Sequence, residues 1–264
     1  MKISIVKILF FIILAFINLR CVHHHKIVPE PDAAIQSRIS EDNQLKILSW
    51  NIKMFPAPYG WLFKPYKRAT NIIHVLQESD GYDIIFFQEA FSGSIRRKIY
   101  AKLQNIYPHE VEPDDQTAFY KINSGLWVIS RLPITLIKHI SFTKFRESDK
   151  LASKGAKLFS VKKDKQEFHL IHTHMQADYE KSNSDVRTLQ YTEIYNQLIL
   201  PHEKEVIPLI LCGDLNISEP GKLKKMMDKL KLQNGPLMGM LQHSTIGRSK
   251  KLLDYILIGG NYSK

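Results

Sequence analysis

The sequence predicts an α/β fold in which two sheets pack face to face and helices cover them from outside. Strand-like apolar runs alternate along the chain with segments whose apolar residues recur at helical spacing, and this alternation is typical of α/β folds. With 264 residues, 44% of them hydrophobic and 24% charged, the chain suits one large domain with a full core and is not disordered. The structural alternative is a series of βαβ units around one parallel sheet.

Residues 1–21 predict a signal peptide or a lipoprotein anchor. Two lysines precede the apolar run 8–17, which has the length of a signal-peptide core and is short for a membrane-spanning helix. Cys21 follows this run and suggests bacterial lipidation, but Arg20 stands where such sites prefer a small residue. A signal cleaved elsewhere in the segment and an uncleaved anchor are the alternatives. In each case we expect the protein to be exported, either secreted or tethered to the cell envelope.

The polar, proline-containing residues 22–44 predict a tether that leads to a folded domain over residues 45–264. Three consecutive histidines at positions 23–25 are expected to be solvated. Cys21 and Cys212 are the only cysteines in the sequence. Because Cys212 lies in a predicted buried strand, no structural disulfide is expected.

Five predicted strands each lead into a polar residue. The predicted strands, each with the polar residue that follows it, are 46–50 with Asn51, 83–88 with Glu89, 168–173 with His174, 206–212 with Asp214 after one glycine, and 252–253 with Asp254. A single acid after a strand is usually a turn or a helix cap. Five such ends predict a functional site at the rim of the core, where α/β enzymes keep their chemistry.

The remaining predicted elements lie between these strands. Further strands are predicted at 124–130 and 156–161, and helices at 67–77, 184–200 and 221–230. Apolar residues of the first two helices fall on one helical face, as expected for helices that cover a sheet.

The oxygen-bearing residues in this set predict a Mg²⁺ site. Glu89, Asn51, Asp214 and Asn216 offer carboxylate and amide oxygens, which suit Mg²⁺, or another hard divalent cation, better than a soft-ligand metal. No cluster of cysteines and histidines has zinc spacing. A carboxylate-held cation suits phosphodiester hydrolysis, because it offsets the charge of the pentacoordinate transition state and helps to activate water.

In their order along the chain, these motifs resemble the endonuclease/exonuclease/phosphatase superfamily. The matching segments are 49–51, 87–89, 124–126, 130–134, 173–174, 213–216 and 253–257. The resemblance implies a deoxyribonuclease-I-like fold, a four-layer α/β sandwich of two mixed sheets with outer helices. Finer detail resembles the neutral sphingomyelinases of bacterial type. This detail comprises the Lys154-Gly155 pair and the Val-Arg-Thr-x-Gln element at 186–190.

The resemblance also implies roles for the site residues. It assigns Glu89 to the metal, and Asn51 and Asn216 to metal or phosphate contacts. It gives Asp214 a role in positioning water or metal, and it places His174 over the phosphate as an electrostatic stabiliser or acid. A histidine can act in either way near neutral pH.

Asp254 matches the family's acid that orients a general-base histidine, which belongs to an Asp-His pair on a following strand. No such pair follows before Lys264, so residues 45–264 are predicted to lack the final strand. Hydrolysis by these residues alone is expected to be weak or absent, because loss of a general base costs ~10²–10⁴-fold in rate. His172 is the first candidate for a replacement base. Otherwise His169 and His172 are interpreted as structural, with His172 on the face of His174.

An aromatic loop and a basic charge favour a membrane partner. Trp61 and Phe63 lie in the aromatic segment 54–67 beside lysines, a composition suited to a membrane interface, and a covered hydrophobic loop is the alternative. The net charge of +11 suits an anionic membrane surface, and it suits nucleic acid equally well.

We therefore expect a Mg²⁺-dependent phosphodiesterase that hydrolyses sphingomyelin-type phospholipid to ceramide and phosphocholine, with the membrane surface as its partner. One alternative is an extracellular metal-dependent endonuclease, in which nucleic acid would be the substrate. The other is a catalytically inactive remnant that binds membranes.

Overall fold

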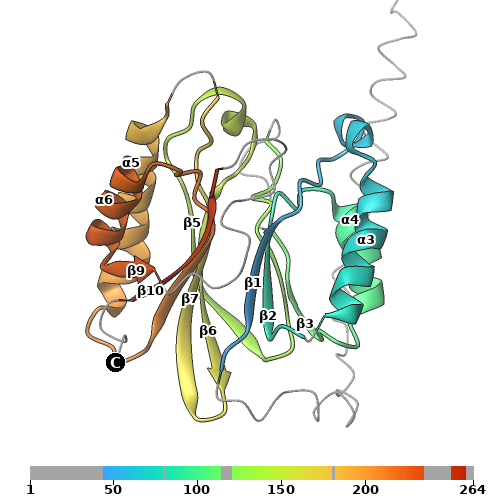
Figure 1. Ribbon diagram of the computed structural model, residues 1–264, viewed down its shortest axis with the longest axis horizontal. Coiled ribbons are helices and arrows are strands. Elements are labelled where there is room, and N and C mark those ends of the chain that lie inside the picture. Colours follow the sequence, from blue (N-terminus) through green and yellow to red (C-terminus); the bar gives the residue numbers. More distant parts are fainter. Residues whose placement is uncertain (1–43, 80, 114–120, 180–181, 235–250, 260–264) are drawn as a thin grey trace, which may run out of the picture. The chain divides into compact units, whose positions relative to one another are not determined.

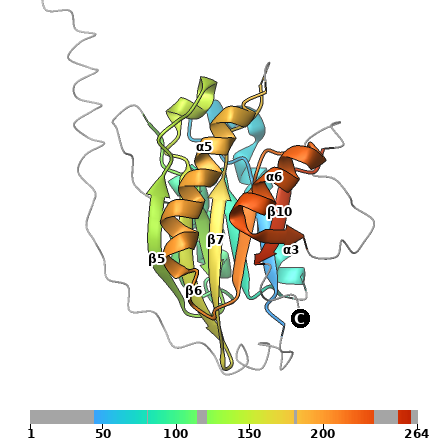
Figure 2. The same cartoon turned by 90° about the vertical axis from the view of Figure 1, so that its left-hand side faces the viewer.

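Two sheets packed face to face form the centre of the protein, and helices cover both outer faces (Figure 1, Figure 2). The computed structural model describes residues 44–79, 81–113, 121–179, 182–234 and 251–259. Both sheets are mixed, so the predicted four-layer α/β sandwich is confirmed and the single parallel sheet is excluded. The predicted export segment and residues 22–43 of the predicted tether lie outside the described residues.

The first sheet has four strands in the order β1-β2-β4-β3. The strands are β1 (Ile47–Asn51), β2 (Ile84–Gln88), β3 (His109–Val111) and β4 (Trp127–Ser130). β1 and β2 are parallel, and the other pairs are antiparallel. The carboxyl ends of β1 and β2 therefore lie at the same edge of this sheet.

The second sheet has six strands in the order β5-β6-β7-β8-β10-β9. The strands are β5 (Ile134–Ser141), β6 (Gly155–Lys163), β7 (Gln166–His174), β8 (Leu209–Asp214), β9 (Leu232–Asn234) and β10 (Asp254–Gly259). β7 and β8 are parallel, whereas β10 runs antiparallel to β8. The start of β10 therefore meets the carboxyl ends of β7 and β8.

Three helices lie where the sequence predicts them, and a fourth, α4, was not predicted. α3 (Pro65–Glu78) and α4 (Gly93–Leu103) cover the first sheet, and α5 (Ser184–Ile194) and α6 (Pro220–Leu230) cover the second. α5 continues into a π-helical turn, η3 (Tyr195–Ile199), and a short 3₁₀ segment, η4 (Leu200–His202). Two further 3₁₀ turns are η1 (Tyr59–Phe63) and η2 (Glu147–Leu151). Among the described residues, no helix is both long and apolar enough to cross a membrane.

Side-chain alternation along the strands divides the core into three apolar layers. In β2, Ile85 and Phe87 pack toward the helices of the first sheet, whereas Ile84 and Phe86 pack between the sheets, as the period of two in a strand requires. Cys212 lies in the layer between the sheets as a buried free thiol. Because both faces of each sheet are covered, the site residues must gather at an edge of the sandwich.

Candidate active site

The five predicted strand-end residues meet at one edge of the two sheets. Asn51 ends β1 and Glu89 directly follows its parallel neighbour β2. His174 and Asp214 end β7 and β8 and face one another in the parallel register. Asp254 begins β10 opposite Asp214. The sheet register thus gathers residues that are far apart in the sequence.

Asn51 joins the two sheets at this edge. Its amide Nδ2 donates to Glu89 Oε1 at 2.7 Å and to Asp214 Oδ2 at 3.0 Å. Its Oδ1 accepts from the backbone N–H of Lys53 at 3.1 Å, which sets the orientation of the amide. In this arrangement Asn51 positions two carboxylates from different sheets, and its role as a direct metal ligand stays a prediction.

Unusual backbone conformations place two of the acids. Glu89 has a φ of 53°, in the left-handed region that non-glycine residues rarely adopt and that recurs at active sites. Gly213 has a φ of 145°, and a Cβ there would lie 1.9 Å from the carbonyl oxygen of Thr173. Only glycine therefore allows β8 to approach β7 this closely, which sets Asp214 beside His174.

The acids at this edge are held away from solvent. Burial raises the pKa of Asp214 to about 6, and the Glu89 carboxylate acts in the same direction. Burial raises the pKa of Asp254 to about 7, and the charges of Asp214 and Glu89 add to this shift. Asp254 Oδ1 is buried and has no hydrogen-bond partner among the described residues. The group therefore holds more negative charge than its hydrogen bonds compensate.

A divalent cation fits this group of donors. Glu89, His174 and Asp214 each offer one ligand atom, and these atoms lie within 4.8 Å of one another. A bound cation would favour the ionised carboxylates and so reverse the pKa shifts that burial causes. The two carboxylates are the donors that suit Mg²⁺.

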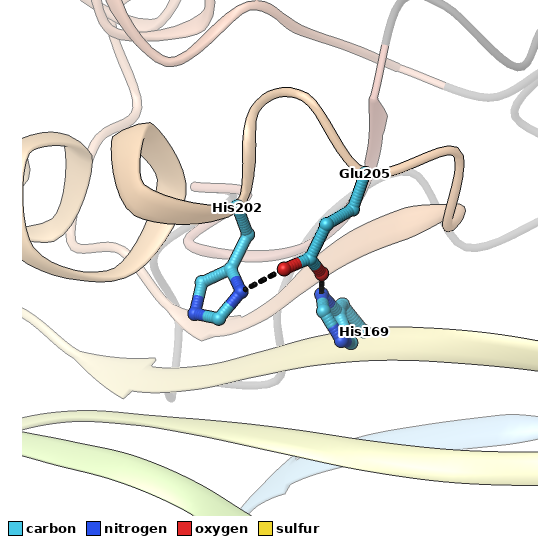
Figure 3. A group of neighbouring side chains, drawn as sticks. All are labelled: His169, His202 and Glu205. Atoms are coloured by element: carbon cyan, nitrogen blue, oxygen red, sulfur yellow. Dashed lines mark hydrogen bonds and ion pairs between the residues drawn. The ribbon is translucent and has the colours of Figure 1, made fainter.

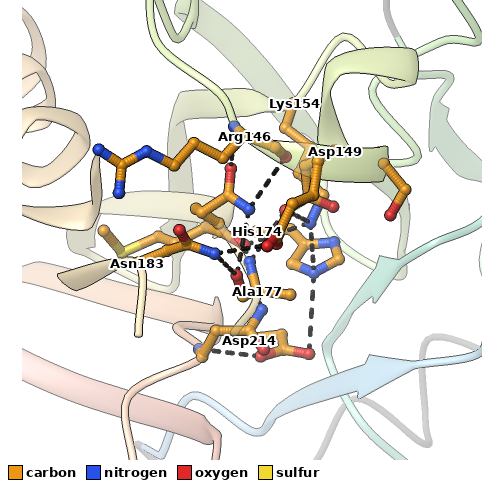
Figure 4. A network of polar contacts seen from close by, with 12 residues as sticks. Arg146, Asp149, Lys154, His174, Ala177, Asn183 and Asp214 are labelled. Atoms are coloured by element: carbon orange, nitrogen blue, oxygen red, sulfur yellow. Dashed lines mark hydrogen bonds and ion pairs between the residues drawn. The ribbon is translucent and has the colours of Figure 1, made fainter. Parts of the chain in front are cut away.

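His174 is buried beside an ammonium group (Figure 4). Lys154 Nζ lies 3.1 Å from His174 Nε2, which in turn lies 3.8 Å from Asp214 Oδ2. Since an ammonium group only donates, Nε2 accepts and the ring hydrogen lies on Nδ1. Burial and then the charge of Lys154 lower the pKa of His174 well below its usual range. The imidazole is therefore neutral near pH 7, and the positive charge of this pair lies on Lys154.

Lys154 and its carboxylate partner, Asp149, have no role predicted from the sequence. The two form a buried ion pair with an N–O distance of 2.9 Å and side chains that are 4% and 7% exposed. Asp149 also accepts from the backbone N–H of Ala177 at 2.9 Å and from the Tyr179 hydroxyl at 3.0 Å. In the sequence, the Lys154-Gly155 pair of the family resemblance points to this lysine. The ion pair with Asp149 holds the lysine beside His174.

The Val-Arg-Thr-x-Gln element holds the loop that follows His174. Arg187 donates to both oxygens of Asp178, at 2.8 Å and 3.0 Å, and to the carbonyl oxygen of Gln176 at 2.9 Å. The backbone N–H of Gln176 donates to Gln190 Oε1 at 2.9 Å. Two residues of α5 therefore fix the loop that carries the partners of Asp149.

Asn216 borders the group of metal donors, since its backbone N–H donates to Asp214 Oδ1 at 3.0 Å, whereas His172 and His169 lie apart from that group. The Asn216 side chain donates to the carbonyl oxygen of Met175 at 3.1 Å, so it fixes the loop after β8. His172 is buried between the sheets, where its Nε2 lies 2.9 Å from Gln88 Nε2. His169 lies earlier on β7, opposite the first residue of β8, Leu209.

The predicted membrane residues lie in a segment attached to the loop of Glu89. The backbone N–H of Met54 donates to the carbonyl oxygen of Glu89 at 2.8 Å. Trp61 is 66% exposed, as expected for an interfacial residue. Phe63 is half-buried, because its ring packs against those of Phe55 and Tyr59. The loop therefore combines an exposed tryptophan with an aromatic cluster beneath it.

Comparisons with known proteins find relatives in sequence and in fold. Sphingomyelinase C 2 from Leptospira interrogans serogroup Icterohaemorrhagiae serovar Lai is 25% identical over 219 residues, which cover 76% of this chain and 35% of that protein. The chain thus spans about a third of the length of that relative. A β-hairpin deletion mutant of beta toxin from Staphylococcus aureus superposes with a TM-score of 0.71 at 21% identity, covering 84% of this chain and 89% of the other.

A double mutant of the same toxin with bound magnesium ions also shares this fold. It superposes with a TM-score of 0.69 at 19% identity and covers 83% of this chain and 85% of the other. A sequence model of the Endonuclease/Exonuclease/phosphatase family matches residues 48–263, a range that includes all five strand-end residues. The protein therefore belongs to the endonuclease/exonuclease/phosphatase family.

Proposed function

We propose that the chain is a Mg²⁺-dependent phosphodiesterase that hydrolyses sphingomyelin-type phospholipid to ceramide and phosphocholine. The observation that carries the proposal is the edge where Asn51 bridges the Glu89 and Asp214 carboxylates beside His174. Membership of the family supports phosphodiester hydrolysis. Relatives named sphingomyelinase C, among them one from Bacillus cereus at 24% identity, support the lipid substrate.

In the proposed mechanism, residues of both sheets hold the cation and the phosphate. Glu89 and Asp214 would bind Mg²⁺, which when bound supplies Lewis-acid charge that offsets the negative charge of the transition state. Asn51 keeps the two carboxylates at a set spacing, so the site is organised before substrate arrives. Asp254 contributes a buried carboxyl group that can accept a hydrogen bond from water or from an imidazole.

Lys154 and His174 supply the other side of the site. The lysine ammonium holds His174 Nε2 as an acceptor, which leaves the Nδ1 hydrogen without a hydrogen-bond partner among the described residues. The Nδ1 atom is itself buried, whereas Nε2 faces Asp214, and the adjacent ammonium charge favours an anion at this edge. The pair would therefore stabilise the substrate phosphate by electrostatics.

The aromatic loop supports a substrate that lies in a membrane. Trp61 and Leu62 are 66% and 75% exposed at the end of a segment attached to Glu89. Exposed aromatic and aliphatic side chains beside lysines suit the boundary between headgroups and acyl chains. Docking by this loop would bring a headgroup phosphate toward the metal donors.

Replacing Trp61 and Leu62 together by alanine is expected to weaken binding to sphingomyelin vesicles at least about tenfold, because one large apolar side chain contributes about 1.5–3 kcal/mol when buried. Vesicle flotation measures this change. The matched control is Leu200→Ala with Val206→Ala, which removes two exposed apolar side chains from the segment between α5 and β8 and should leave binding unchanged. Unchanged vesicle binding by the loop variant, together with nicking of plasmid DNA in Mg²⁺, would favour the endonuclease.

The endonuclease is kept as the second candidate because the same metal donors and a net charge of +11 would also suit a nucleic acid. Export is part of the proposal as well. It rests on the apolar run at 8–17 and the cysteine that follows it.

A further inference from the structure

A second group of potential ligands lies near the start of β7 (Figure 3). His169 lies on that strand, His202 ends η4, and Glu205 lies in the turn that follows. The Glu205 carboxylate lies between the two rings. Its Oε1 is 3.0 Å from His202 Nδ1, and its Oε2 is 3.7 Å from His169 Nδ1. The two ring centroids are 5.1 Å apart, so both imidazoles face the same carboxylate.

Local hydrogen bonds hold the three residues in this arrangement. The backbone N–H of His169 donates to the carbonyl oxygen of Pro208 at 2.8 Å, which ties β7 to the segment before β8. The backbone N–H of Glu205 donates to the carbonyl oxygen of His202 at 3.0 Å, which closes the turn. All three side chains line one pocket, whose other walls include apolar residues of η3 and α6.

We propose that His169, His202 and Glu205 bind a zinc ion, with water as the fourth ligand. Two imidazoles and one carboxylate form a ligand set that zinc uses in proteins. Their ligand atoms lie within 4.8 Å of one another, and zinc holds such atoms at about 2.0–2.2 Å from itself, so binding draws the group together. Glu205 and His202 lie on a surface turn that can make this adjustment around the buried His169.

The chemistry of this group distinguishes it from the group at Glu89. Imidazole nitrogen suits zinc, whereas Mg²⁺ prefers oxygen donors. Burial lowers the pKa of His169, although the Glu205 charge opposes the shift, and a neutral ring is the form that binds a metal. The two groups also lie apart along β7, with His174 at its end and His169 opposite Leu209, the first residue of β8.

The zinc ion would connect the start of β7 to the connection between α5 and β8. This connection contains no regular element between η4 and β8, so a metal clip there would restrict a segment that is otherwise held by the turn and its hydrogen bonds. We therefore expect zinc to raise the unfolding temperature without supplying a catalytic group.

The test uses the full chain with His23→Asn, His24→Asn and His25→Asn, because those histidines could also bind zinc. In this parent protein, zinc chloride is expected to leave one tightly bound equivalent at the cluster after dialysis and to raise the unfolding temperature. His202→Asn and Glu205→Gln should each abolish the tightly bound zinc and the zinc-dependent rise in unfolding temperature. These two residues are chosen because they are less buried than His169, and circular dichroism without zinc checks that each variant folds.

Two controls identify the site. His74→Gln alters an exposed His–Glu pair on α3, in which His74 Nδ1 lies 2.8 Å from Glu78 Oε2, and should leave both zinc effects in place. Glu89→Gln should also retain them, because it alters only the other group. The proposal is overturned if folded His202→Asn and Glu205→Gln bind as much zinc as the parent and show the same rise. The proposal would also be overturned if His74→Gln lost as much bound zinc, and as much of the rise in unfolding temperature, as those two variants.

Discussion

Replacing Glu89 by glutamine is expected to lower the affinity for Mg²⁺ at least about 100-fold and to abolish hydrolysis at ordinary Mg²⁺ concentrations. Loss of an outer-shell partner alone costs about 10–100-fold in metal affinity, and Glu89 is a candidate direct ligand within 4.8 Å of Asp214. The fold should persist, because the glutamine amide oxygen can still accept from Asn51 Nδ2, which donates to Glu89 at 2.7 Å. Calorimetric titration with Mg²⁺ measures the change.

The control for this experiment is Glu78→Gln at the end of α3. Glu78 is exposed and pairs with His74 on the same helix, so its loss removes one carboxylate without touching the site. Its Mg²⁺ affinity should match that of the unaltered protein. Equal affinities in the unaltered protein and in Glu89→Gln would remove Glu89 from the metal site.

Lys154→Met is expected to lower the free energy of unfolding by about 3–5 kcal/mol, because it leaves the Asp149 carboxylate buried without its counter-charge. The side chains of the pair are 4% and 7% exposed, and the N–O distance is 2.9 Å. The variant should also lower the rate of hydrolysis per folded molecule by about 10–100-fold, in the range seen when a residue that orients a ligand is lost. Urea unfolding and a rate measurement on the folded fraction test the two effects.

A second buried ion pair separates the effect on stability from the effect on activity. Lys163 Nζ lies 2.8 Å from Asp83 Oδ2, and these side chains are 3% and 5% exposed. The pair lies at the end of β6 and before β2, away from His174. Lys163→Met should therefore cost a similar free energy of unfolding and leave the rate per folded molecule unchanged. If both variants lose the same fraction of activity, Lys154 has a structural role only.

Much of the fold could be predicted from the sequence because each predicted element has its own local signal. The apolar run of β2 fills two core layers with alternate side chains, and the helix predicted over 67–77 is observed as α3 (Pro65–Glu78). The π-helical turn Tyr195–Ile199 was not predicted, because the apolar spacing of residues 184–200 fits a continuous helix equally well.

The candidate site could be predicted in part for the same reason. Glu89 directly follows a strand and Asp214 ends one, so the sheet topology determines where they lie. The partner of Lys154 could not be predicted, because Asp149 belongs to a 3₁₀ turn whose position depends on how the loops after β5 and β7 pack. The cluster at His169 was missed as well, because its other two members lie beyond α5 and no sequence spacing connects them with β7.

The most direct test of the proposed function is phosphorus NMR of sphingomyelin vesicles incubated with the protein. Spectra are recorded with Mg²⁺ and with a chelator, with Glu89→Gln as the control, and plasmid DNA is incubated in parallel. The proposal predicts that phosphocholine forms, at the low rate expected of residues 45–264 alone, only with Mg²⁺ and the unaltered protein, while the DNA stays intact. Intact sphingomyelin at saturating Mg²⁺, whether or not the DNA is nicked, would contradict it.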